Sequence, residues 1–442
     1  MRTPRTGAVL GGRGPALPFV AYMALSNAQF TRGVFVLFLL RGNISLAEVG
    51  LLESLFHLTR VLCEVPAGSV ADRWGRRRTI QAGLILSAAA MPAFLLGGMF
   101  WYALAFVFQG AGWAAQRGAD TALLYELLER TGGTDRYARI LGRSHAASYG
   151  TLALTTALGA MLYQRHVSLP FWLQAAVTLL AVGAIGVLPE SSGTAASGAG
   201  SSGSGSSGEP AERPMGVWRL ARAGARLVVG HPVLRLFVAF VALVEAGTTV
   251  VSIFSQSFFR TLGYGTATTG LILALVTAFS AAAALQSHRL VERGPVRVLM
   301  AASSLYLVGL AGMASLQPQL AVVGYYLVFL NLDLLAPVLS AFFHRSVDEE
   351  VRATAGSYLN LSTSVLTFAA FPLSGSLIDA GGYRPLLIIT ALVSLPLLVF
   401  LVGAARRVLS PPEEGDSGED AGERAGPKGP GAAAPDTTTT GV

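Results

Sequence analysis

The chain is poor in charge, in lysine and in cysteine. Of its 442 residues 13% are charged, and it holds one lysine, Lys428, and one cysteine, Cys63. A single cysteine excludes an intrachain disulfide and a cysteine-cluster metal site. The six histidines are scattered, and no H-E-x-x-H, G-x-S-x-G or G-x-x-x-x-G-K-[ST] string occurs. We therefore expect no metal, no cofactor, no enzymatic centre and no ATP-driven step.

What the chain has in abundance is apolar sequence. Apolar residues make up 52% of it and the mean hydropathy is +0.55, far from a soluble globular protein. Crossing a bilayer takes about 20 apolar residues per helix. We find twelve such segments, which predict an all-α integral membrane protein with twelve transmembrane helices. They cover residues 17–40, 47–69, 79–98, 101–126, 142–163, 169–188, 232–258, 266–287, 297–316, 319–343, 353–378 and 384–404.

Arginine is distributed unevenly between the two sides that these spans define. Most loop arginines, including the cluster at 73–78, fall on one side, whereas the other side holds mainly Arg41, Arg165, Arg260 and Arg384. The arginine-rich side should be cytoplasmic. We therefore expect a multi-pass protein of the bacterial inner (plasma) membrane with both termini in the cytoplasm. The arginines form no continuous basic face, so the net charge of +7 does not indicate nucleic acid.

The spans fall into two groups of six. Residues 191–208 between them are almost entirely Ser, Gly and Ala, which is typical of a flexible linker. The chain after Arg407 is rich in Pro, Gly, Glu, Asp and Thr, and we expect it to be disordered. The predicted parts are a cytoplasmic N-terminal segment (1–16), an N-terminal six-helix bundle (17–188), a cytoplasmic linker with an amphipathic segment (189–231), a C-terminal six-helix bundle (232–405) and the tail (406–442).

The loop after the second span carries the most informative motif. Residues 68–78 match the pattern G-x-x-x-D-R-x-G-R-[RK] at every fixed position. This loop resembles the signature loop of the major facilitator superfamily, and the resemblance covers residues 15–407. It implies two six-helix bundles around a central cavity that opens alternately to each side of the membrane.

In that family the signature loop acts as a conformational lock. The resemblance implies that Asp72 faces a helix N-terminus of the other bundle and that Arg76 or Arg77 reaches an acid at the inner end of span 4. Alternatively, these charges only anchor the loop at the membrane surface. The residues implied in the lock are Gly68, Asp72, Gly75, Arg76, Arg77 and Glu126.

Two other patterns of the family are absent. Phe106 stands where span 4 of many proton-driven exporters has the arginine of R-x-x-Q-G, and residues 150–155 lack the Gly-Pro of many drug antiporters. These departures argue against a well-characterised drug/proton antiporter, but not against the superfamily.

The resemblance implies that spans 1, 4, 7 and 10 line the cavity, and polar residues recur on these spans, at helical spacing on spans 4 and 7. The substrate-cavity candidates are Asn27, Gln29, Arg32, Gln109, Trp113, Gln116, Thr249, Ser252, Gln256 and Asn331. Span 2 adds a stripe of Glu53, His57, Arg60 and Glu64.

Ionisable residues within a bilayer are costly and usually functional. The proton-coupling candidates are Glu245, Asp333, Asp120 and Glu64. Glu245 is the first choice because its own helix offers no obvious partner. The alternative for the other buried charges is a structural ion pair, Arg60 with Glu64 or Arg117 with Asp120.

These features predict a secondary active transporter of a small organic solute, with protons as coupling ion and the lipid bilayer as surroundings. We expect a monomer, proton-coupled efflux by alternating access, and a neutral or cationic amphipathic solute. Nutrient uptake by symport or facilitated diffusion is the alternative. A membrane-embedded enzyme and a non-transporting receptor or scaffold are less favoured. Fold alone does not set the substrate.

Overall fold

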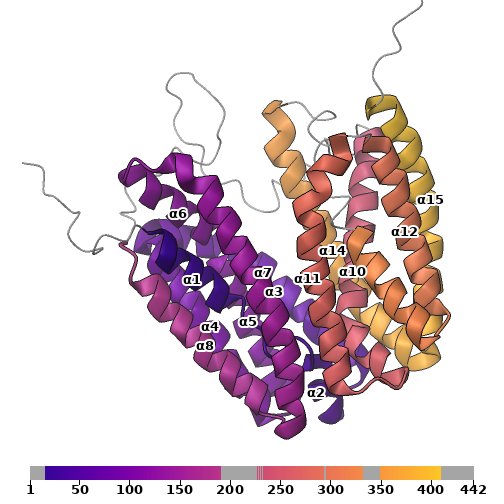
Figure 1. The fold of residues 1–442 in the computed structure, drawn as a ribbon, viewed down its shortest axis with the longest axis horizontal. Helices are drawn as coiled ribbons and strands as arrows, with labels where there is room; N and C mark the ends of the chain where they lie inside the picture. Colours follow the sequence, from indigo (N-terminus) through magenta and orange to yellow (C-terminus); the bar gives the residue numbers. More distant parts are fainter. Residues whose placement is uncertain are drawn as a thin grey trace, which may run out of the picture. The chain divides into compact units, whose positions relative to one another are not determined.

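A computed structural model describes residues 15–190, 226, 228, 230, 232–292, 295–331 and 349–409. The predicted all-α fold is confirmed, because every regular element in these ranges is a helix (Figure 1). The helices are α1 (Ala16–Ser26), α2 (Phe35–Arg41), α3 (Leu46–Trp74), α4 (Arg76–Leu96), α5 (Met99–Gln116), α6 (Ala119–Arg130), the 3-10 helix η2 (Thr134–Arg136), α7 (Tyr137–Arg165), α8 (Leu169–Gly186), α10 (Pro232–Thr261), α11 (Thr266–Glu292), α12 (Pro295–Ala314), the helix Pro318–Asn331, α14 (Glu349–Gly381) and α15 (Tyr383–Leu409).

Several predictions concern residues outside these ranges. They include the Ser/Gly-rich linker at 191–208, most of the amphipathic segment, the tail after residue 409 and the candidate Asp333.

Two of the predicted spans are not continuous helices. Span 1 is divided into α1 and α2 by a connector of residues 27–34, and span 4 is divided into α5 and α6 at Arg117 and Gly118. Gly118 has φ +83°, a left-handed conformation that glycine adopts without steric cost and that ends a right-handed helix. Hydropathy alone could not reveal either break, because apolar residues continue on both sides.

The start and end of α3 follow from local chemistry. Ser45 and Glu48 form a capping box: the Ser45 hydroxyl accepts from the Glu48 N–H, and the Glu48 carboxylate accepts from the Ser45 N–H. At the other end Gly75, with φ +97°, separates α3 from α4. We call the N-terminal end of α3 and its surroundings the Ser45 end, and the C-terminal end of α3 with the turn at Gly75 the signature end.

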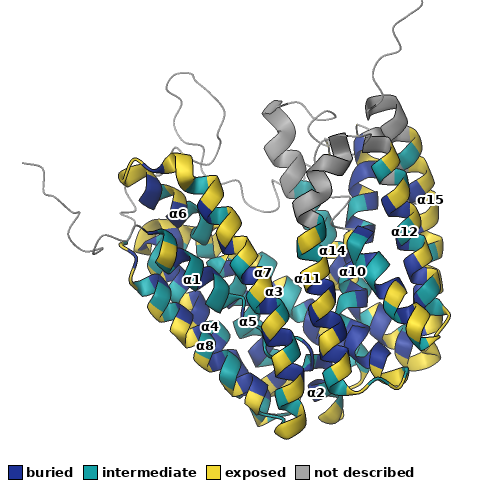
Figure 2. Ribbon diagram, viewed as in Figure 1, coloured by how far each residue is buried: buried dark blue, intermediate teal, exposed yellow. Residues whose placement is uncertain are grey.

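The outer faces of the helices are apolar. Six helices or helix segments among the described residues have the length and composition to cross a membrane by themselves, in α4, α8, α10, α11, α14 and α15. On α15 the side chains of Leu392, Val399 and Phe400 are 62%, 66% and 57% exposed, and exposed positions run along the outer helix faces in Figure 2. Apolar exposure on this scale is expected of a surface that meets lipid.

Helices from the two halves of the chain lie side by side. α3 packs along α14, α7 along α11, and α2 against α10 (Figure 1). Buried aromatic side chains fill the N-terminal half near α2, where Phe35 and Phe94 meet edge to face with ring centroids 4.9 Å apart. Phe106 meets both rings at 5.5 Å. These rings form an apolar wall beside the broken span 1.

Candidate functional site

The described part of the chain encloses a cavity of about 700 Å³ at the two broken spans. It is lined mainly by residues of α1, the 27–34 connector, α3, α4, α5, α7 and α10, with further residues from α2, α6, α8 and α11, and the aromatic wall of Phe35, Phe94 and Phe106 forms part of it. Several residues selected from the sequence line it: Asn27, Gln29, Arg32, Gln109, Trp113, Gln116, Asp120, Ser252 and Gln256. Irregular backbone within a membrane is tolerated where it lines such a cavity.

Side chains from three other helices fasten the connector of span 1. The Gln29 N–H donates to Thr155 of α7 at 3.0 Å, and the Thr31 N–H and hydroxyl both donate to Gln174 of α8 at 3.0 and 2.7 Å. The Gln256 side chain of α10 accepts from the Val36 N–H and donates to the Arg32 carbonyl, each at 2.8 Å. These bonds replace those a continuous helix would have made.

Some cavity candidates are therefore already occupied by structural bonds. Gln256 uses both atoms of its amide on the connector, and Asn27 donates to the Met23 carbonyl at 2.9 Å. Gln116 donates to the Gly112 carbonyl, also at 2.9 Å. The side chains of Gln29, Arg32 and Gln109 line the cavity without a hydrogen bond to any described residue. These three are free to meet a solute.

The two ion pairs considered from the sequence do not form among the described residues. The Arg60 and Arg117 guanidinium carbons lie over the Trp113 ring, 4.6 and 4.3 Å from its centroid, and Arg60 also donates to Ser364 of α14 at 3.3 Å. Glu64 is exposed. Asp120 instead accepts from the Thr121 N–H at 2.7 Å, in the first turn of α6. Cation–π contact offers arginine an alternative to a carboxylate.

Glu53 is a site residue that the sequence reading named in the span 2 stripe but did not select. Its side chain is 6% exposed and lines the cavity from α3. No described residue forms an ion pair or a hydrogen bond with its carboxyl group. Its signal in the sequence was an acid early in span 2, one helical turn before His57 and on the same stripe as Arg60 and Glu64.

Glu245 lies elsewhere than expected. Its side chain is exposed and does not line the cavity, and Thr249 donates to its backbone carbonyl rather than contributing to the cavity. Its carboxyl group makes no ion pair with a described residue, and the charges of Arg60 and Arg117 act on it. Glu245 thus lies near the two arginines at Trp113 but does not itself line the cavity. Asn331 is completely buried, and both polar atoms of its amide lack a partner among the described residues.

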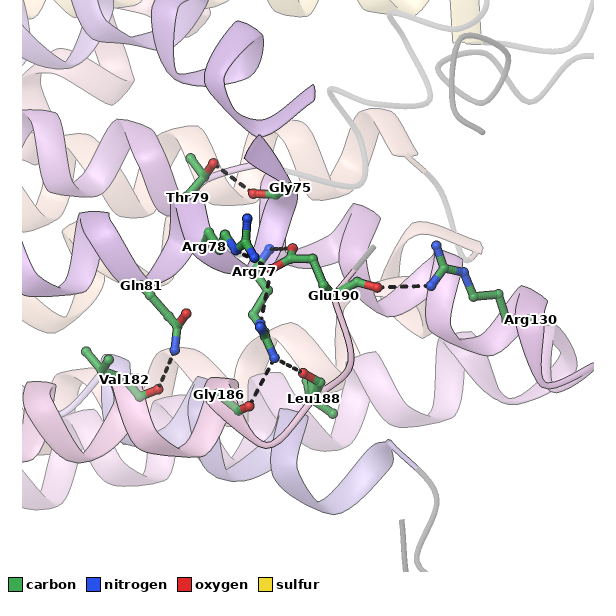
Figure 3. Close-up of polar contacts among 10 residues, drawn as sticks. All are labelled: Gly75, Arg77, Arg78, Thr79, Gln81, Arg130, Val182, Gly186, Leu188 and Glu190. Carbon is green, nitrogen blue, oxygen red and sulfur yellow. Dashed lines mark hydrogen bonds and ion pairs between the residues drawn. The ribbon is translucent and has the colours of Figure 1, made fainter. Parts of the chain in front are cut away.

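The signature loop is tied to the end of α8. Arg76 pairs with Glu126 at 3.1 Å, and the Arg77 side chain donates to Glu190 and to the carbonyls of Gly186 and Leu188 (Figure 3). The Glu190 carbonyl also accepts from Arg130 at 3.0 Å. The sequence reading missed Glu190, whose only signal was an acid directly after span 6. Cationic side chains at a helix C-terminus are favoured by its free carbonyls.

The two ends of α3 differ in their contact with α14. At the Ser45 end the Asp379 carboxylate accepts from the Leu46 and Ala47 N–H groups at 3.3 and 2.8 Å. Gly50 and Gly375 lie against the facing backbone so closely that a Cβ would collide with it. At the signature end no described residue lies within 4 Å of a Cβ position on Gly68, and none pairs with Asp72.

Two helical halves around a polar cavity define a membrane transporter of the facilitator type. The family model described as Major Facilitator Superfamily matches residues 14–332 and 236–435. The chain belongs to the major facilitator superfamily. A comparison with curated protein sequences finds no significant match.

Solved structures similar to this chain are also transporters. The nucleoside transporter NupG matches with a TM-score of 0.70 and 15% identity, over 88% of this chain and 97% of that one. A bacterial homologue of the human lysosomal transporter Spinster, in an inward-facing and unoccupied conformation, matches with 0.64 and 16% over 89% and 96%. A D-xylose–proton symporter matches with 0.62 and 13% over 88% and 95%. At these identities the likeness concerns the fold.

Proposed function

We propose that the chain is a secondary active transporter that carries a small organic solute through the cavity at the broken spans by alternating access. The observation that carries the proposal is the set of unused polar groups on the cavity wall, above all Arg32 and the unpaired Glu53. Groups of this kind are costly inside a membrane unless they serve a solute or a coupling ion. The solute is bound there, not chemically changed.

Proton coupling is assigned first to Glu53. An unpaired carboxylate that is removed from water is strongly disfavoured, so closing the cavity around Glu53 favours the protonated carboxyl. Opening the cavity to water lets the proton leave. Glu245, the first choice from the sequence, becomes the second candidate, because it is exposed and has two arginines nearby. Asp120, Glu64 and Asp333 follow.

We propose that the cavity opens to one side of the membrane and then to the other as the two ends of the α3–α14 pair close in turn. Asp379 would hold the Ser45 end closed in the state described here, and Asp72 would hold the signature end closed in the opposite state. α3 and α14 run antiparallel, and Leu46 and Gly50 lie against Gly375 and Phe371. Continuing this register places Gly68 opposite residues 353–356 and Asp72 opposite the first turn of α14. A carboxylate at a helix N-terminus is favoured by the exposed N–H groups and the helix dipole.

The orientation and the direction of transport remain proposals from the sequence. The arginine-rich signature end is assigned to the cytoplasm of a bacterial inner membrane, with both termini on that side and a monomer as the working unit. Efflux against proton influx was the sequence expectation. Uptake by symport is an equal alternative, since similar folds are named as a nucleoside transporter and a D-xylose–proton symporter.

The test is solute-linked proton movement in proteoliposomes. The purified full chain is reconstituted with a pH dye inside, and candidate solutes are added outside in turn. A solute that is carried should produce a pH change that requires the chain and is lost in Glu53→Gln. A solute that binds the chain but neither crosses the membrane nor moves protons would contradict the transporter. Orienting the vesicles by protease access to the tail then assigns direction.

A further inference from the structure

Arg32 is held in the cavity by bonds that do not involve its guanidinium group. It lies in the connector between α1 and α2, where its backbone carbonyl accepts from Gln256 of α10. The start of α2, which follows the connector, is also fastened, since the Val36 N–H donates to the same Gln256 side chain. The backbone of Arg32 is therefore fixed between the two halves, and its side chain is presented to the cavity.

The guanidinium group has no acceptor among the described residues. Its five N–H donors make no ion pair and no hydrogen bond with any of them. The two carboxyl groups that line the cavity, on Glu53 and Asp120, do not pair with it. By contrast Arg117, the other arginine on the cavity wall, stacks on Trp113.

An arginine placed this way is expensive for the empty protein. A cation within the membrane is costly unless it is paired, and no described residue pairs with Arg32. Arginine is also suited to bind a carboxylate or a phosphate through two parallel N–H bonds. An acid group on the solute would accept hydrogen bonds from the guanidinium group. Binding would therefore remove the free-energy cost of leaving that cation unpaired.

The rest of the pocket indicates what the acid group is attached to. Phe35, the first residue of α2, lies three positions after Arg32 in the chain and belongs to the aromatic wall with Phe94 and Phe106. The free side chains of Gln29 and Gln109 also face the cavity. A solute could then place its apolar body on these rings and its acid group at Arg32.

We propose that Arg32 binds the acid group of an anionic organic solute, a carboxylate or a phosphate ester, whose apolar body rests on the wall of Phe35, Phe94 and Phe106. The proposal rests on the transport function and narrows its substrate class. It replaces the neutral or cationic solute expected from the sequence, which considered the acids of the cavity before the unpaired arginine.

The first arm of the test concerns the protein without solute. If Arg32 were a structural partner, Arg32→Gln would lower the melting temperature of the purified chain. If it is an unpaired binding group, Arg32→Gln should leave the melting temperature unchanged or raise it. Arg165→Gln is the matched control, because Arg165 is exposed at the end of α7. Arg32→Lys keeps the charge without the planar fork and covers the case in which Arg32→Gln folds poorly.

The second arm measures binding with matched probes. Each set uses one carbon skeleton as carboxylate, phosphate ester, amide and amine, for example benzoate, phenyl phosphate, benzamide and benzylamine, followed by longer aryl and alkyl skeletons. We expect thermal stabilisation of the wild-type chain by carboxylates or phosphate esters and not by the amides or amines. Affinity should fall about 10- to 100-fold in Arg32→Gln, less in Arg32→Lys, and not in Arg165→Gln. Comparing the two acid series decides between carboxylate and phosphate.

Three results would overturn the assignment: stabilisation by neutral or cationic members only, anion binding that is equal in Arg32→Gln, or no stabilisation by any anion. Its failure is distinct from failure of the transport function. Anion binding without solute movement in proteoliposomes would remove the transporter and keep the site. Transport of a neutral solute at wild-type rate by Arg32→Gln would keep the transport function and remove the anion site.

Discussion

Each end of the α3–α14 pair carries a glycine and an aspartate, but these residues have different surroundings at the two ends. Gly50 and Gly68 are eighteen residues apart, which is about five helical turns and about 27 Å, so they lie on the same face of the helix. Gly50 lies against the backbone of Phe371, whereas Gly68 has open space. Asp379 caps the first turn of α3 at one end. Asp72 stands at the other end without a described partner.

The difference indicates how one helix pair can serve two states. Each end has a glycine that permits close approach and an aspartate suited to the N-terminus of the facing helix. A transporter that alternates needs both closures to be possible and neither to be too stable. On the proposed mechanism, the contact at the Ser45 end is one of two comparable closures that form in turn.

The largest effect is expected from Gly50→Leu. A side chain at this position collides with the Phe371 carbonyl and with Pro372, and neither backbone atom can move aside cheaply. Overpacking of this kind costs about 1–3 kcal/mol, which shifts the equilibrium about 5- to 150-fold away from closure at the Ser45 end. Transport should fall by a similar factor, measured as solute flux per folded molecule in proteoliposomes.

Gly68→Leu and Gly150→Leu sharpen this experiment. Both glycines have open space in the described state, so neither substitution should lower expression or melting temperature. Gly150→Leu, on α7, should transport normally, whereas Gly68→Leu should trap the state described here. Normal transport by Gly68→Leu would remove the proposed second closure at the signature end.

The next effect compares two acids, the buried Glu53 and the exposed Glu245. A gradient of one pH unit is worth about 1.4 kcal/mol per proton and supports at most about tenfold accumulation. Glu53→Gln should reduce accumulation to none while solute exchange without a gradient continues. Glu245→Gln should retain most of the gradient-driven accumulation. The reverse ranking, measured in the same vesicles, would return Glu245 to first place.

A smaller effect is expected from the aspartates. Asp379→Asn removes the charge at the N-terminus of α3, and Asp72→Asn removes the equivalent charge at the other end. A charge at a helix terminus is worth about 0.3–2 kcal/mol, so each change should shift the population about 2- to 30-fold. The two shifts should be in opposite directions when distances across each end are measured by spin labels. Shifts in the same direction would mean that the aspartates do not belong to opposed closures.

The smallest effect concerns the anchor of the signature loop. Arg77→Gln removes bonds to Glu190 and to two carbonyls at the end of α8, and partly exposed ion pairs contribute about 1 kcal/mol or less. We expect a slight fall in melting temperature and little change in transport. Arg78→Gln is the control, since Arg78 is 67% exposed and lies 3.6 Å from Glu190. An equal fall in both variants would assign no special role to Arg77.

Much of the fold could be predicted from the sequence because long apolar runs determine its membrane-spanning helices. The membrane class, the helical segments and the superfamily follow from hydropathy and from the signature at 68–78. The break in span 1 could not be predicted, because the connector at 27–34 and the start of α2 are stabilised by Thr155, Gln174 and Gln256 from distant helices. The local sequence does not indicate such bonds, because their partners lie far away in the chain. The break in span 4 lies at Gly118, whose positive φ does not register in the hydropathy.

The candidate site was predicted in part. Helical spacing placed Gln109, Trp113 and Gln116 on the cavity wall, but spacing does not tell which helix face is wet. Glu245 was therefore expected in the cavity, and Glu53 was passed over. Gln256 was expected to meet solute and instead fastens the connector. Pairing between residues far apart in the chain decides these cases, and it is visible only in three dimensions.

The central claim, that the two ends of the α3–α14 pair close in turn, is tested most directly by two distances in one sample. With Cys63 replaced by serine, spin labels at Ser45 and Arg384 report on the Ser45 end, and labels at Arg73 and Arg297 report on the signature end. We predict that a solute or a pH gradient shortens one distance as it lengthens the other, and that Gly50→Leu and Gly68→Leu drive the pair in opposite directions. Two distances that stay fixed, or that change together, would contradict the account.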